Sequence, residues 1–375
     1  MQKKKLLIFH PYLATYRIDL YNALSKVFDV NVLLTGGEKE LADLGYDLQT
    51  VNRHADFSYR YYSKGFYVGR HLISSIYSTT IKKFKPDIVI AHELGINTLI
   101  AILLKRVYSR YALFVTIDDS PNMAIVNHGL LRKLLRRFVI SRVNGLLVVN
   151  PQVKDFLMHK FSKKSCQYFY LPIIQDEKIL ADKLHDALPL SKQIFEQSTF
   201  RGKKLILYIG RLIEIKDPGL LLETFATLHK NHTDVQLIFI GDGVLKNTLM
   251  EYTVAHHLQN DVHFLGRLTG VDLFAWYNIG QLLVLPSKQE AFGAVVNEAL
   301  VAGCKVIVSD SVGASCLVNE KNGIIFKTNN HYSLYNALSN VLTTVSPLDS
   351  VTLKKNNMDK PFSEYIHELI NFITL

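Results

Sequence analysis

The sequence predicts an α/β protein built from two doubly wound parallel sheets, and three observations lead to this fold class. Short β-branched and apolar runs recur along the chain with gaps of helix length between them. Several runs are apolar almost throughout, which is typical of parallel strands covered by helices on both faces. The chain has 375 residues, which at ~150 residues per domain suits two cores. Hydrophobic residues make up 48% and charged residues 20%, so a mainly disordered chain is excluded.

Six apolar runs mark the predicted strands of the first half, at residues 4–10, 30–35, 87–92, 112–118, 145–150 and 167–171. The aromatic and basic stretch 59–71 lies between two of them, and we place it on a loop and a helix start. Together these segments predict a first domain at residues 1–175.

The second half repeats the alternation, with predicted strands at residues 205–209, 235–240, 262–265, 281–285, 305–309 and 323–326. Helical segments and short Gly-rich turns lie between them. We expect the second domain at residues 200–345. Because the segment 176–199 is polar and weakly periodic, we place a linker there. The C-terminal segment 361–375 contains a last amphipathic helix, which we expect to pack back on the first domain.

The charge of the chain is concentrated in its first half. The whole sequence carries 43 Lys and Arg against 33 Asp and Glu, a formal net charge of +10. Residues 1–180 hold 26 basic and 14 acidic residues, a net of +12, which leaves −2 for the remainder. A positive surface of this kind is compatible with nucleic acid, anionic lipid or an anionic small ligand.

Cysteine usage and apolar runs indicate the compartment. The three cysteines, Cys166, Cys304 and Cys316, form neither a disulfide framework nor a CxxC metal motif, which favours a reducing compartment and a mechanism without thiols. The N-terminal apolar run stops at His10, too early for a secretory signal. No stretch reaches the ~18 apolar residues of a spanning helix. We therefore expect a cytoplasmic protein, soluble or peripheral on the inner face of the membrane.

Charged side chains follow several predicted strands where they end. In doubly wound sheets, ligands bind beyond the carboxyl ends of the strands, and the crevice between two such domains is the default site. The residues at these ends are His10, His92, Glu93, Asp118, Asp119, Arg211 and Glu290.

The segment LYIGRLIEIKD, residues 207–217, carries two cations after a strand. The strand ends at Gly210, Arg211 follows, and Lys216 comes just before a helix start at Pro218. Two cations beside a helix N-terminus suit a pyrophosphate. A surface turn with solvated charges is the alternative.

Two further glycine turns follow strands in the same half. GDG at 241–243 and FLG at 264–266 allow a tight turn or a close approach of backbone to a flat base. Each is by itself more typical of a structural turn.

Two carboxylates lie eight positions apart in LVLPSKQEAFGAVVNEAL, residues 283–300. Glu290 lies in the turn after a strand, and Glu298 lies two turns inside a helix predicted at 291–302. A carboxylate at each place suits the hydroxyls of a sugar and of a ribose. Two Glu at this spacing are common by chance, whereas the whole string is not.

These motifs together resemble retaining GT-B glycosyltransferases of the large group called family 4. The resemblance is carried by GRL-x3-KD at 210–217, GDG at 241–243, FLG at 264–266 and LPS-x2-EAFG-x4-EAL at 285–300. It covers roughly residues 203–327. It implies two Rossmann-like domains that face each other across a cleft, with a nucleotide-sugar bound by the second domain.

The resemblance also implies roles for individual residues. Arg211 and Lys216 would clamp the diphosphate, Glu298 would bind the ribose, and Glu290 would hold the donor sugar. The donor site would be completed by Gly210, Gly241, Arg267, Leu268, Ala291, Phe292 and Gly293. The family needs neither metal nor cofactor, because cations and a helix terminus neutralise the leaving diphosphate. No DxD-type metal motif is suitably placed in the sequence.

The first strand and its loop depart from the common family pattern. Family members often have a glycine-rich loop there, whereas this chain has FHPYLATYRIDLYNAL at 9–24. That string resembles the start of a subset that makes surface polysaccharides. It implies that Tyr16 and Arg17 lie at the cleft and that His10 contacts the acceptor or a phosphate. A buried structural His is an equal alternative.

The strand that ends at Asp118 is a second departure, because many members have a His there. Asp118 would accept a hydrogen bond from a sugar hydroxyl or act as a base toward the acceptor, and capping a turn is the alternative. We expect His92 on the acceptor side in a supporting or structural place. Leu317 replaces a common Glu, which implies one hold fewer on the donor.

The first-half charge gathers in HGLLRKLLRRFVISR at 128–142. Its basic residues are Arg132, Lys133, Arg136, Arg137 and Arg142. An apolar stripe at helical spacing is formed by Leu130, Leu131, Leu134, Leu135 and Phe138. The pattern predicts that residues 130–142 form an interfacial helix on an anionic membrane, and it favours a lipid-diphosphate-linked acceptor. A helix packed on the sheet with a solvated basic face is the alternative.

The sequence as a whole predicts a metal-independent retaining glycosyltransferase. It would move a hexose or N-acetylhexosamine from a nucleotide diphosphate sugar, a UDP-sugar being favoured, to a hydroxyl of a lipid-linked or surface glycan such as lipopolysaccharide or capsule. A GDP-mannose-dependent mannosyltransferase is the alternative within the family. A basic nucleic-acid-binding protein is the alternative from another class. It leaves Glu290 and Glu298 unexplained, so we expect no nucleic acid partner.

Overall fold

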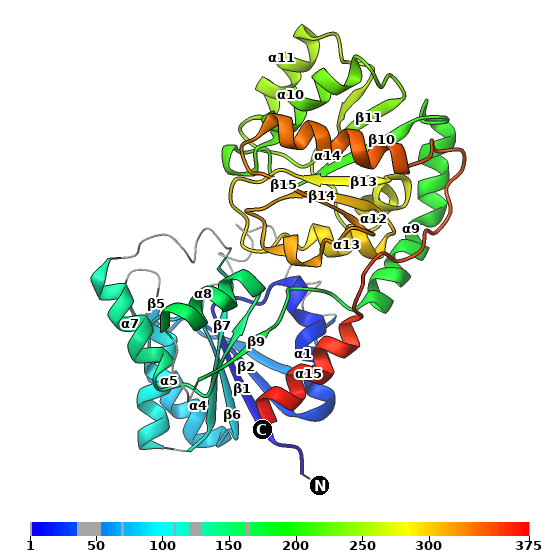
Figure 1. Cartoon of the computed structure of the whole chain (residues 1–375). Helices are drawn as coiled ribbons and strands as arrows, with labels where there is room; N and C mark the ends of the chain where they lie inside the picture. The colour runs from blue at the N-terminus through cyan, green and yellow to red at the C-terminus, as the bar shows by residue number, and fades with distance from the viewer. Residues whose placement is uncertain are drawn as a thin grey trace. The chain divides into compact units, whose positions relative to one another are not determined.

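The computed structural model describes residues 2–35, 54–68, 71–108, 110–119, 129–161 and 166–374. These residues form two compact units, each with its own parallel sheet (Figure 1). The first unit holds the described residues up to Gln175 and the C-terminal segment from Phe362, and the second holds Asp176–Pro361. The predicted fold class of two doubly wound sheets is confirmed.

The sheet of the first unit has seven parallel strands in the order β3-β2-β1-β6-β7-β8-β9. In chain order they are β1 (Lys5–His10), β2 (Asp29–Leu34), β3 (Ser58–Tyr61), β6 (Ile88–His92), β7 (Ala112–Ile117), β8 (Gly145–Val148) and β9 (Gln167–Tyr170). The first strand lies in the middle, with β2 on one side and β6 on the other. The strand order therefore reverses between β1 and β6.

Helices cover both faces of this sheet (Figure 1). One face packs against α4 (Ile76–Phe84), α5 (Ile96–Val107), α7 (Leu130–Ile140) and α8 (Pro151–Phe161). The other face packs against α1 (Thr15–Val27) and α15 (Phe362–Thr374). Successive side chains of β1 point to opposite faces of the sheet. Leu7 and Phe9 pack in the core with α4, α5, α7 and α8, and Ile8 and His10 face α1.

The stretch 59–71 is not the predicted loop and helix start. It contributes the edge strand β3 and the antiparallel hairpin of β4 (Phe66–Val68) and β5 (His71–Ile73). The aromatic side chains explain the difference, since Tyr and Phe favour extended backbone where they can stack across a sheet. The rings of Tyr59 and Tyr61 pack edge to face, 6.2 Å apart.

The sheet of the second unit has six parallel strands in the order β12-β11-β10-β13-β14-β15. They are β10 (Lys204–Ile209), β11 (Val235–Ile240), β12 (Val262–Phe264), β13 (Leu282–Leu285), β14 (Lys305–Ser309) and β15 (Gly323–Phe326). On one face lie α10 (Pro218–His229), α11 (Lys246–Ala255) and α14 (His331–Thr344). On the other lie α9 (Glu177–Gln197), α12 (Gly270–Ile279) and α13 (Val295–Val301) (Figure 1).

The prediction that residues 176–199 are a linker is wrong. These residues form helix α9, which belongs to the second unit. Leu180 and Leu184 are buried, and the Asn278 amide of α12 donates to the Leu184 carbonyl at 2.8 Å. These apolar residues recur at helical spacing. They are separated by enough Lys, Asp and Glu to make the segment look polar on average.

The C-terminal helix α15 packs on the first unit through aromatic contacts. The Phe372 ring lies 5.6 Å from that of Phe114 and 5.0 Å from that of Phe169, between centroids. A Cβ on Gly145 would lie 2.9 Å from the Phe372 ring. The helix therefore lies directly on β8, where only glycine leaves room for it.

Replacing Leu369 of α15 with Ala tests this packing. Leu369 is fully buried, so we expect the free energy of unfolding of the first unit to fall by about 2–5 kcal/mol. Urea unfolding, followed by hydrogen exchange of first-unit peptides, measures it. Ser363→Ala on the exposed side of the same helix is the control, with an expected change within about 0.5 kcal/mol. Equal losses in the two variants would contradict the assignment.

Candidate functional site

In the second unit, the candidate site lies where the strand order reverses, between β10 and β13. The chain leaves β10 toward β11 on one side, and β13 lies on the other side. Loops that leave such a pair of strands diverge, so polar groups at their ends are open to a ligand. These loops carry Gly210–Asp217 and residues 286–294.

The loop after β10 is held by its neighbours. Gly241 has φ +148°, and a Cβ there would lie 1.9 Å from the Gly210 carbonyl oxygen. Only glycine permits this approach. The Tyr208 hydroxyl donates to the Arg211 carbonyl at 2.8 Å, which fixes the backbone, whereas the Arg211 side chain is exposed. No carboxylate of the described residues forms an ion pair with Arg211.

Lys216 and Glu290 form an ion pair that joins the two loops. Both side chains are largely buried, with 13% and 19% of their surface exposed. Asp217 then turns the chain into α10 with a left-handed φ of 51°. The predicted cation and the predicted sugar-binding carboxylate therefore lie side by side at the N-terminus of a 12-residue helix.

The loop that carries Glu290 pairs with the next loop of the sheet. The Gly313 amide donates to the Glu290 carbonyl at 3.1 Å, and the Ala314 amide donates to the Phe292 carbonyl at 2.7 Å. Ala291 is half-buried and Phe292 is buried, and Gly293 adopts φ +94°. These contacts keep residues 291–294 out of the helix.

The helix predicted at 291–302 is therefore shorter than expected and runs from Val295 to Val301. Glu298 lies in its first turn, not two turns inside it. The Tyr277 hydroxyl donates to Glu298 Oε2 at 2.7 Å. Burial and the Glu298 charge raise the pKa of Tyr277 well above its usual range, so the phenol remains the donor. This hydrogen bond orients the carboxylate predicted to hold a ribose.

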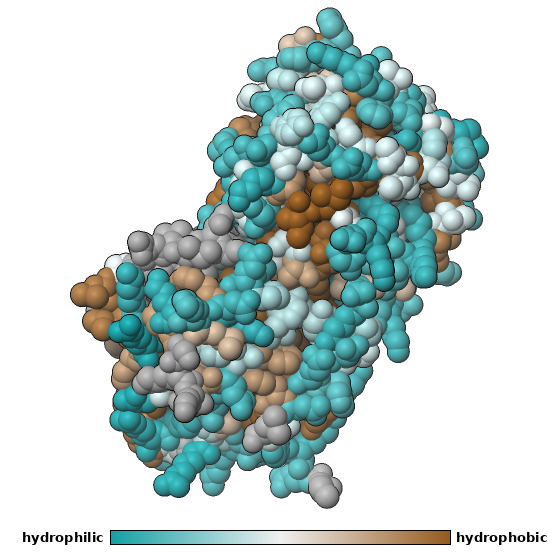
Figure 2. Space-filling view, viewed as in Figure 1, coloured by the Kyte–Doolittle hydropathy of each residue, from teal (hydrophilic) through white to brown (hydrophobic). Residues whose placement is uncertain are grey.

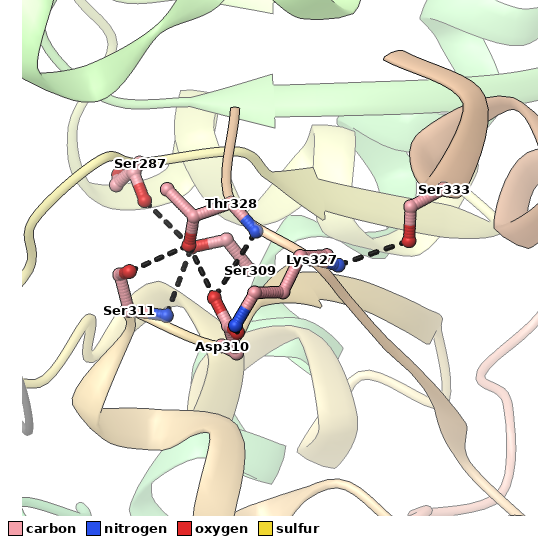
Figure 3. A network of polar contacts seen from close by, with 7 residues as sticks. All are labelled: Ser287, Ser309, Asp310, Ser311, Lys327, Thr328 and Ser333. Atoms are coloured by element: carbon pink, nitrogen blue, oxygen red, sulfur yellow. Dashed lines mark hydrogen bonds and ion pairs between the residues drawn. The ribbon is translucent and has the colours of Figure 1, made fainter. Parts of the chain in front are cut away.

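A network of polar contacts stabilises the loop that carries Glu290 (Figure 3). The Ser309 hydroxyl donates to the Ser287 carbonyl at 2.6 Å, and the Ser311 amide donates to Ser309 Oγ at 3.3 Å. Asp310 accepts from Lys327 Nζ at 2.8 Å and from the Thr328 amide at 3.1 Å. The Ser311 carbonyl accepts from the Glu290 amide at 3.3 Å. The network therefore joins the ends of β13, β14 and β15 to the Glu290 loop.

The segment predicted to meet the base follows β12. The Gly241 amide donates to the Gly266 carbonyl at 2.8 Å, which connects this loop to the one after β11. Arg267 is exposed and Leu268 is half-buried. This backbone hydrogen bond places the loop after β12 beside the close contact between Gly210 and Gly241.

In the first unit, an ion pair lies beyond the carboxyl ends of the central strands. Arg17 Nη2 of α1 donates to both carboxylate oxygens of Asp118 at 2.7 Å. The Arg17 side chain is 3% exposed and that of Asp118 18%. Burial alone would raise the pKa of Asp118, but the Arg17 charge outweighs it and lowers the pKa to about 2. Tyr16 lies beside this pair, its ring centroid 5.9 Å from Arg17 Cζ.

Two histidines adjoin the ion pair. The rings of His10 and His92 lie 4.1 Å apart between centroids. Burial lowers the pKa of His92 to about 4 and that of His10 well below its usual range, so both rings are neutral at pH 7. His10 Nδ1 lies 2.5 Å from the Tyr12 carbonyl, to which it must donate. Its Nε2 is then a buried acceptor that receives no hydrogen bond within the described residues.

Ligand atoms of His10, His92 and Asp118 lie within 4.8 Å of one another, which raises the question of a metal. Both Asp118 oxygens already accept from Arg17, whose charge would repel a cation. The acceptor nitrogens and the guanidinium fit a hydroxyl-bearing or anionic ligand better. The four predicted acceptor-side residues, His10, Tyr16, Arg17 and His92, thus lie around Asp118.

Sequence reasoning missed three supporting residues: Tyr208, Tyr277 and Asp310. The two tyrosines lie in apolar strings and look like core residues, because nothing in the sequence marks which core phenol meets a carboxylate. Asp310 directly follows the strand β14. A charged residue at a strand end is the signal that identified the other candidate residues, and it would also have identified Asp310.

Comparison with known proteins agrees with the geometry of the second unit. Residues 191–355 match the family described as Glycosyl transferases group 1. An uncharacterized glycosyltransferase of Methanocaldococcus jannaschii, MJ1059, is 26% identical over 239 residues, which are 61% of this chain and 57% of that protein. This chain therefore matches little more than half the length of that relative.

A second relative is covered more fully. The GalNAc-alpha-(1->4)-GalNAc-alpha-(1->3)-diNAcBac-PP-undecaprenol alpha-1,4-N-acetyl-D-galactosaminyltransferase of Campylobacter jejuni is 26% identical over 279 residues, 70% of this chain and 74% of that enzyme. The solved structure of Anabaena HepE in complex with UDP has a TM-score of 0.71 at 15% identity and covers 99% of both chains. Residues 191–355 are therefore a group 1 glycosyltransferase domain, in a chain with the GT-B fold.

Proposed function

We propose that this protein is a retaining glycosyltransferase of family 4. It transfers a hexose or N-acetylhexosamine from a nucleotide diphosphate sugar, preferably a UDP-sugar, to a hydroxyl of a lipid-linked or surface glycan. The observation that carries the proposal is the set of loops around the Lys216–Glu290 pair at the reversal of the second sheet, inside a group 1 domain. Anabaena HepE binds UDP, which supports the choice of base.

Each part of the nucleotide-sugar donor would contact a different set of residues in these loops. Arg211, exposed and on a backbone that Tyr208 holds, meets the diphosphate together with Lys216 and the N-terminus of α10. Glu298, oriented by Tyr277, accepts from the ribose hydroxyls. Glu290 and the backbone of 291–293 hold the sugar. A phosphate that approaches Lys216 competes with Glu290 for it and releases the carboxylate toward the sugar.

The chemistry follows from where charge develops. The glycosidic bond to the diphosphate breaks through an oxocarbenium-like transition state, and the bonding electrons go to the phosphate oxygen. Cations fixed beside that oxygen lower the barrier, and removing one such donor costs about 3–4 kcal/mol, or 10²–10³ in rate. The leaving phosphate helps take the proton of the attacking hydroxyl on the same face. Retention then needs no protein nucleophile, metal or cofactor.

The acceptor would use the first unit. The Asp118 carboxylate, kept ionised by Arg17, accepts a hydrogen bond from a sugar hydroxyl. The unpartnered Nε2 of His10 provides a further acceptor. The Campylobacter relative acts on an undecaprenol-diphosphate-linked glycan, which supports a lipid-linked acceptor here.

Helix α7 would hold the protein at an anionic membrane. Leu130, Leu134 and Phe138 lie on one helical face and are 74%, 53% and 44% exposed. Leu103 and Val107 of the neighbouring α5 are each 62% exposed. Figure 2 shows apolar side chains at the surface over α7. The side chains of Leu131 and Arg132 lie outside the described residues.

The basic residues complete this surface. Arg137 is exposed and Arg142 lies over the Phe138 ring, 4.9 Å from its centroid, so both flank the apolar face. Arg136 instead pairs with Asp119 at 3.4 Å. Val139 and Ile140 pack on the sheet, so α7 is both packed and apolar outside. Among the described helices, none combines the length and apolar character that crossing a bilayer requires.

Lys216→Ala and Glu298→Ala test the donor site. Each removes a contact to the leaving diphosphate or the ribose, so we expect transfer to fall by about 10²–10³ or more. A thermal-shift screen of the wild type against UDP-, GDP- and ADP-sugars comes first and identifies the donor, with a GDP-mannose response as the competing outcome. Lys230→Ala, an exposed lysine at the end of α10 in the same unit, is the matched control. Full activity in both site variants would refute the assignment.

Treatment with EDTA tests metal independence. Because Arg211, Lys216 and the α10 terminus neutralise the diphosphate, we expect an unchanged initial rate of sugar transfer. The rate is measured with the donor found in the screen, before and after dialysis against EDTA. A loss of activity that Mg²⁺ restores would contradict the proposal.

The double variant Leu134→Glu and Phe138→Glu tests the membrane surface. Each burial of an apolar side chain in the interface contributes about 0.8 kcal/mol per CH₂, so we expect binding to phosphatidylglycerol-containing vesicles to weaken at least ~10-fold. Vesicle co-sedimentation measures it. Val254→Glu, an equally exposed apolar position on α11, is the control. Unchanged sedimentation of the double variant would leave α7 as a helix with a merely solvated outer face.

A further inference from the structure

Glu93 occupies an unusual backbone position at the end of β6. Its φ of 59° lies in the left-handed region, which a residue with a Cβ rarely adopts. Its amide donates to the Thr116 carbonyl at 2.8 Å, and the Thr98 hydroxyl donates to its carbonyl at 2.5 Å. The main chain of Glu93 is therefore held from β7 and from α5.

The side chain of Glu93 reaches the neighbouring strand end. Its Oε1 accepts from the backbone amide of Asp118 at 3.0 Å. Asp118 is thus held twice, its main chain by Glu93 and its carboxylate by Arg17. The two holds are independent, because the Arg17 bond alone leaves the backbone of residue 118 free to turn after β7 ends.

Burial and the neighbouring carboxylates oppose a negative charge on Glu93, whereas Arg136 favours one. Asp118 and Asp119 face it from the end of β7, Arg136 from α7, and the neutral His92 is its neighbour on β6. Burial raises the pKa of Glu93 to about 8, the charges of Asp119 and Asp118 add to that effect, and the Asp118 amide and Arg136 oppose it. At pH 7 the side chain is mainly a neutral carboxylic acid.

We propose that Glu93 is a positioning residue of the acceptor-side site, a neutral acid that fixes the main chain at Asp118. This inference rests on the proposed function, which gives Asp118 its contact with the acceptor. When Glu93 ionises, three carboxylates lie together, and their repulsion acts on the turn that it holds. Sugar transfer therefore declines above a pH of about 8.

Two variants separate the hydrogen bond from the ionisation. Glu93→Gln retains an acceptor oxygen and is neutral at every pH, so we expect kcat near the wild-type value at pH 7, within about threefold, and no decline above pH ~8. Glu93→Ala lacks the acceptor, so kcat falls about tenfold or more while the KM for the nucleotide-sugar stays unchanged. Glu251→Gln, exposed on α11, is the control.

The kinetic outcomes decide the proposal. An alkaline decline that persists unchanged in Glu93→Gln overturns it, and so does wild-type kcat in Glu93→Ala. If Glu93→Ala does not fold, the comparison of pH profiles for Glu93→Gln and the wild type decides alone.

A measurement without turnover keeps this test apart from the proposed function. Because the pKa of Glu93 is higher in the folded state than in the unfolded chain, its protonation stabilises the folded protein. This contribution is fully present below the unfolded-state pKa of 4.5 and is lost as the pH rises to about 8. The ratio of folding constants, wild type over Glu93→Gln, should therefore fall roughly tenfold per pH unit in this window. A flat ratio overturns the assignment of Glu93. Wild type that transfers no sugar, together with a falling ratio, instead refutes the proposed function and the role of Asp118 in it.

Discussion

The reversal of strand order is the constraint on which both sites depend. In each sheet the first strand of the unit, β1 or β10, lies between the strand that follows it and a strand from later in the chain. Right-handed crossovers then carry the two connections to opposite faces. The strand ends between them are left without a covering helix, and polar residues there keep access to ligand. His10 and His92 in one unit and Arg211 and Glu290 in the other follow from this rule, and Asp118 lies beside the two histidines at the end of the next strand, β7.

The two units treat their charges differently at these places. In the first, Arg17 and Asp118 are buried together and neutralise each other, so the site adds nothing to the net charge of +12 in residues 1–180. That excess instead lies on helices such as α7. In the second, Lys216 is matched by Glu290, whereas Arg211 has no ion-pair partner within the described part of the chain. A nearly neutral half can therefore still present one uncompensated cation to a diphosphate.

Periodicity predicted most strands and the fold class because buried parallel strands are apolar throughout. It failed where averages mislead. Lys and Asp residues lower the average hydrophobicity of α9, so its apolar side is not seen in the average. Arg60 within β3, and Lys64 and Gly65 between β3 and β4, make this aromatic stretch resemble a loop. The motif predicted that Glu298 matters but not its place in the first turn, because the pairing of 290–292 with 312–314 is a contact between distant segments. Tyr277 was missed for the same reason, and Glu93 was predicted only as one of several strand-end residues, because the partners of both are set by packing, which no local pattern encodes.

The return of α15 to the first unit has a consequence for the order of synthesis. The residues that Phe372 covers, among them Phe114 and Gly145, are made long before it. At about 5–20 residues per second, the ribosome takes roughly 10–40 s to add the stretch between Gln175 and Phe362. During that time the face of the first sheet beside α1 lacks its second helix, and apolar surface remains open to solvent. The nascent first unit thus exposes this apolar surface until α15 emerges, although its own strands are complete.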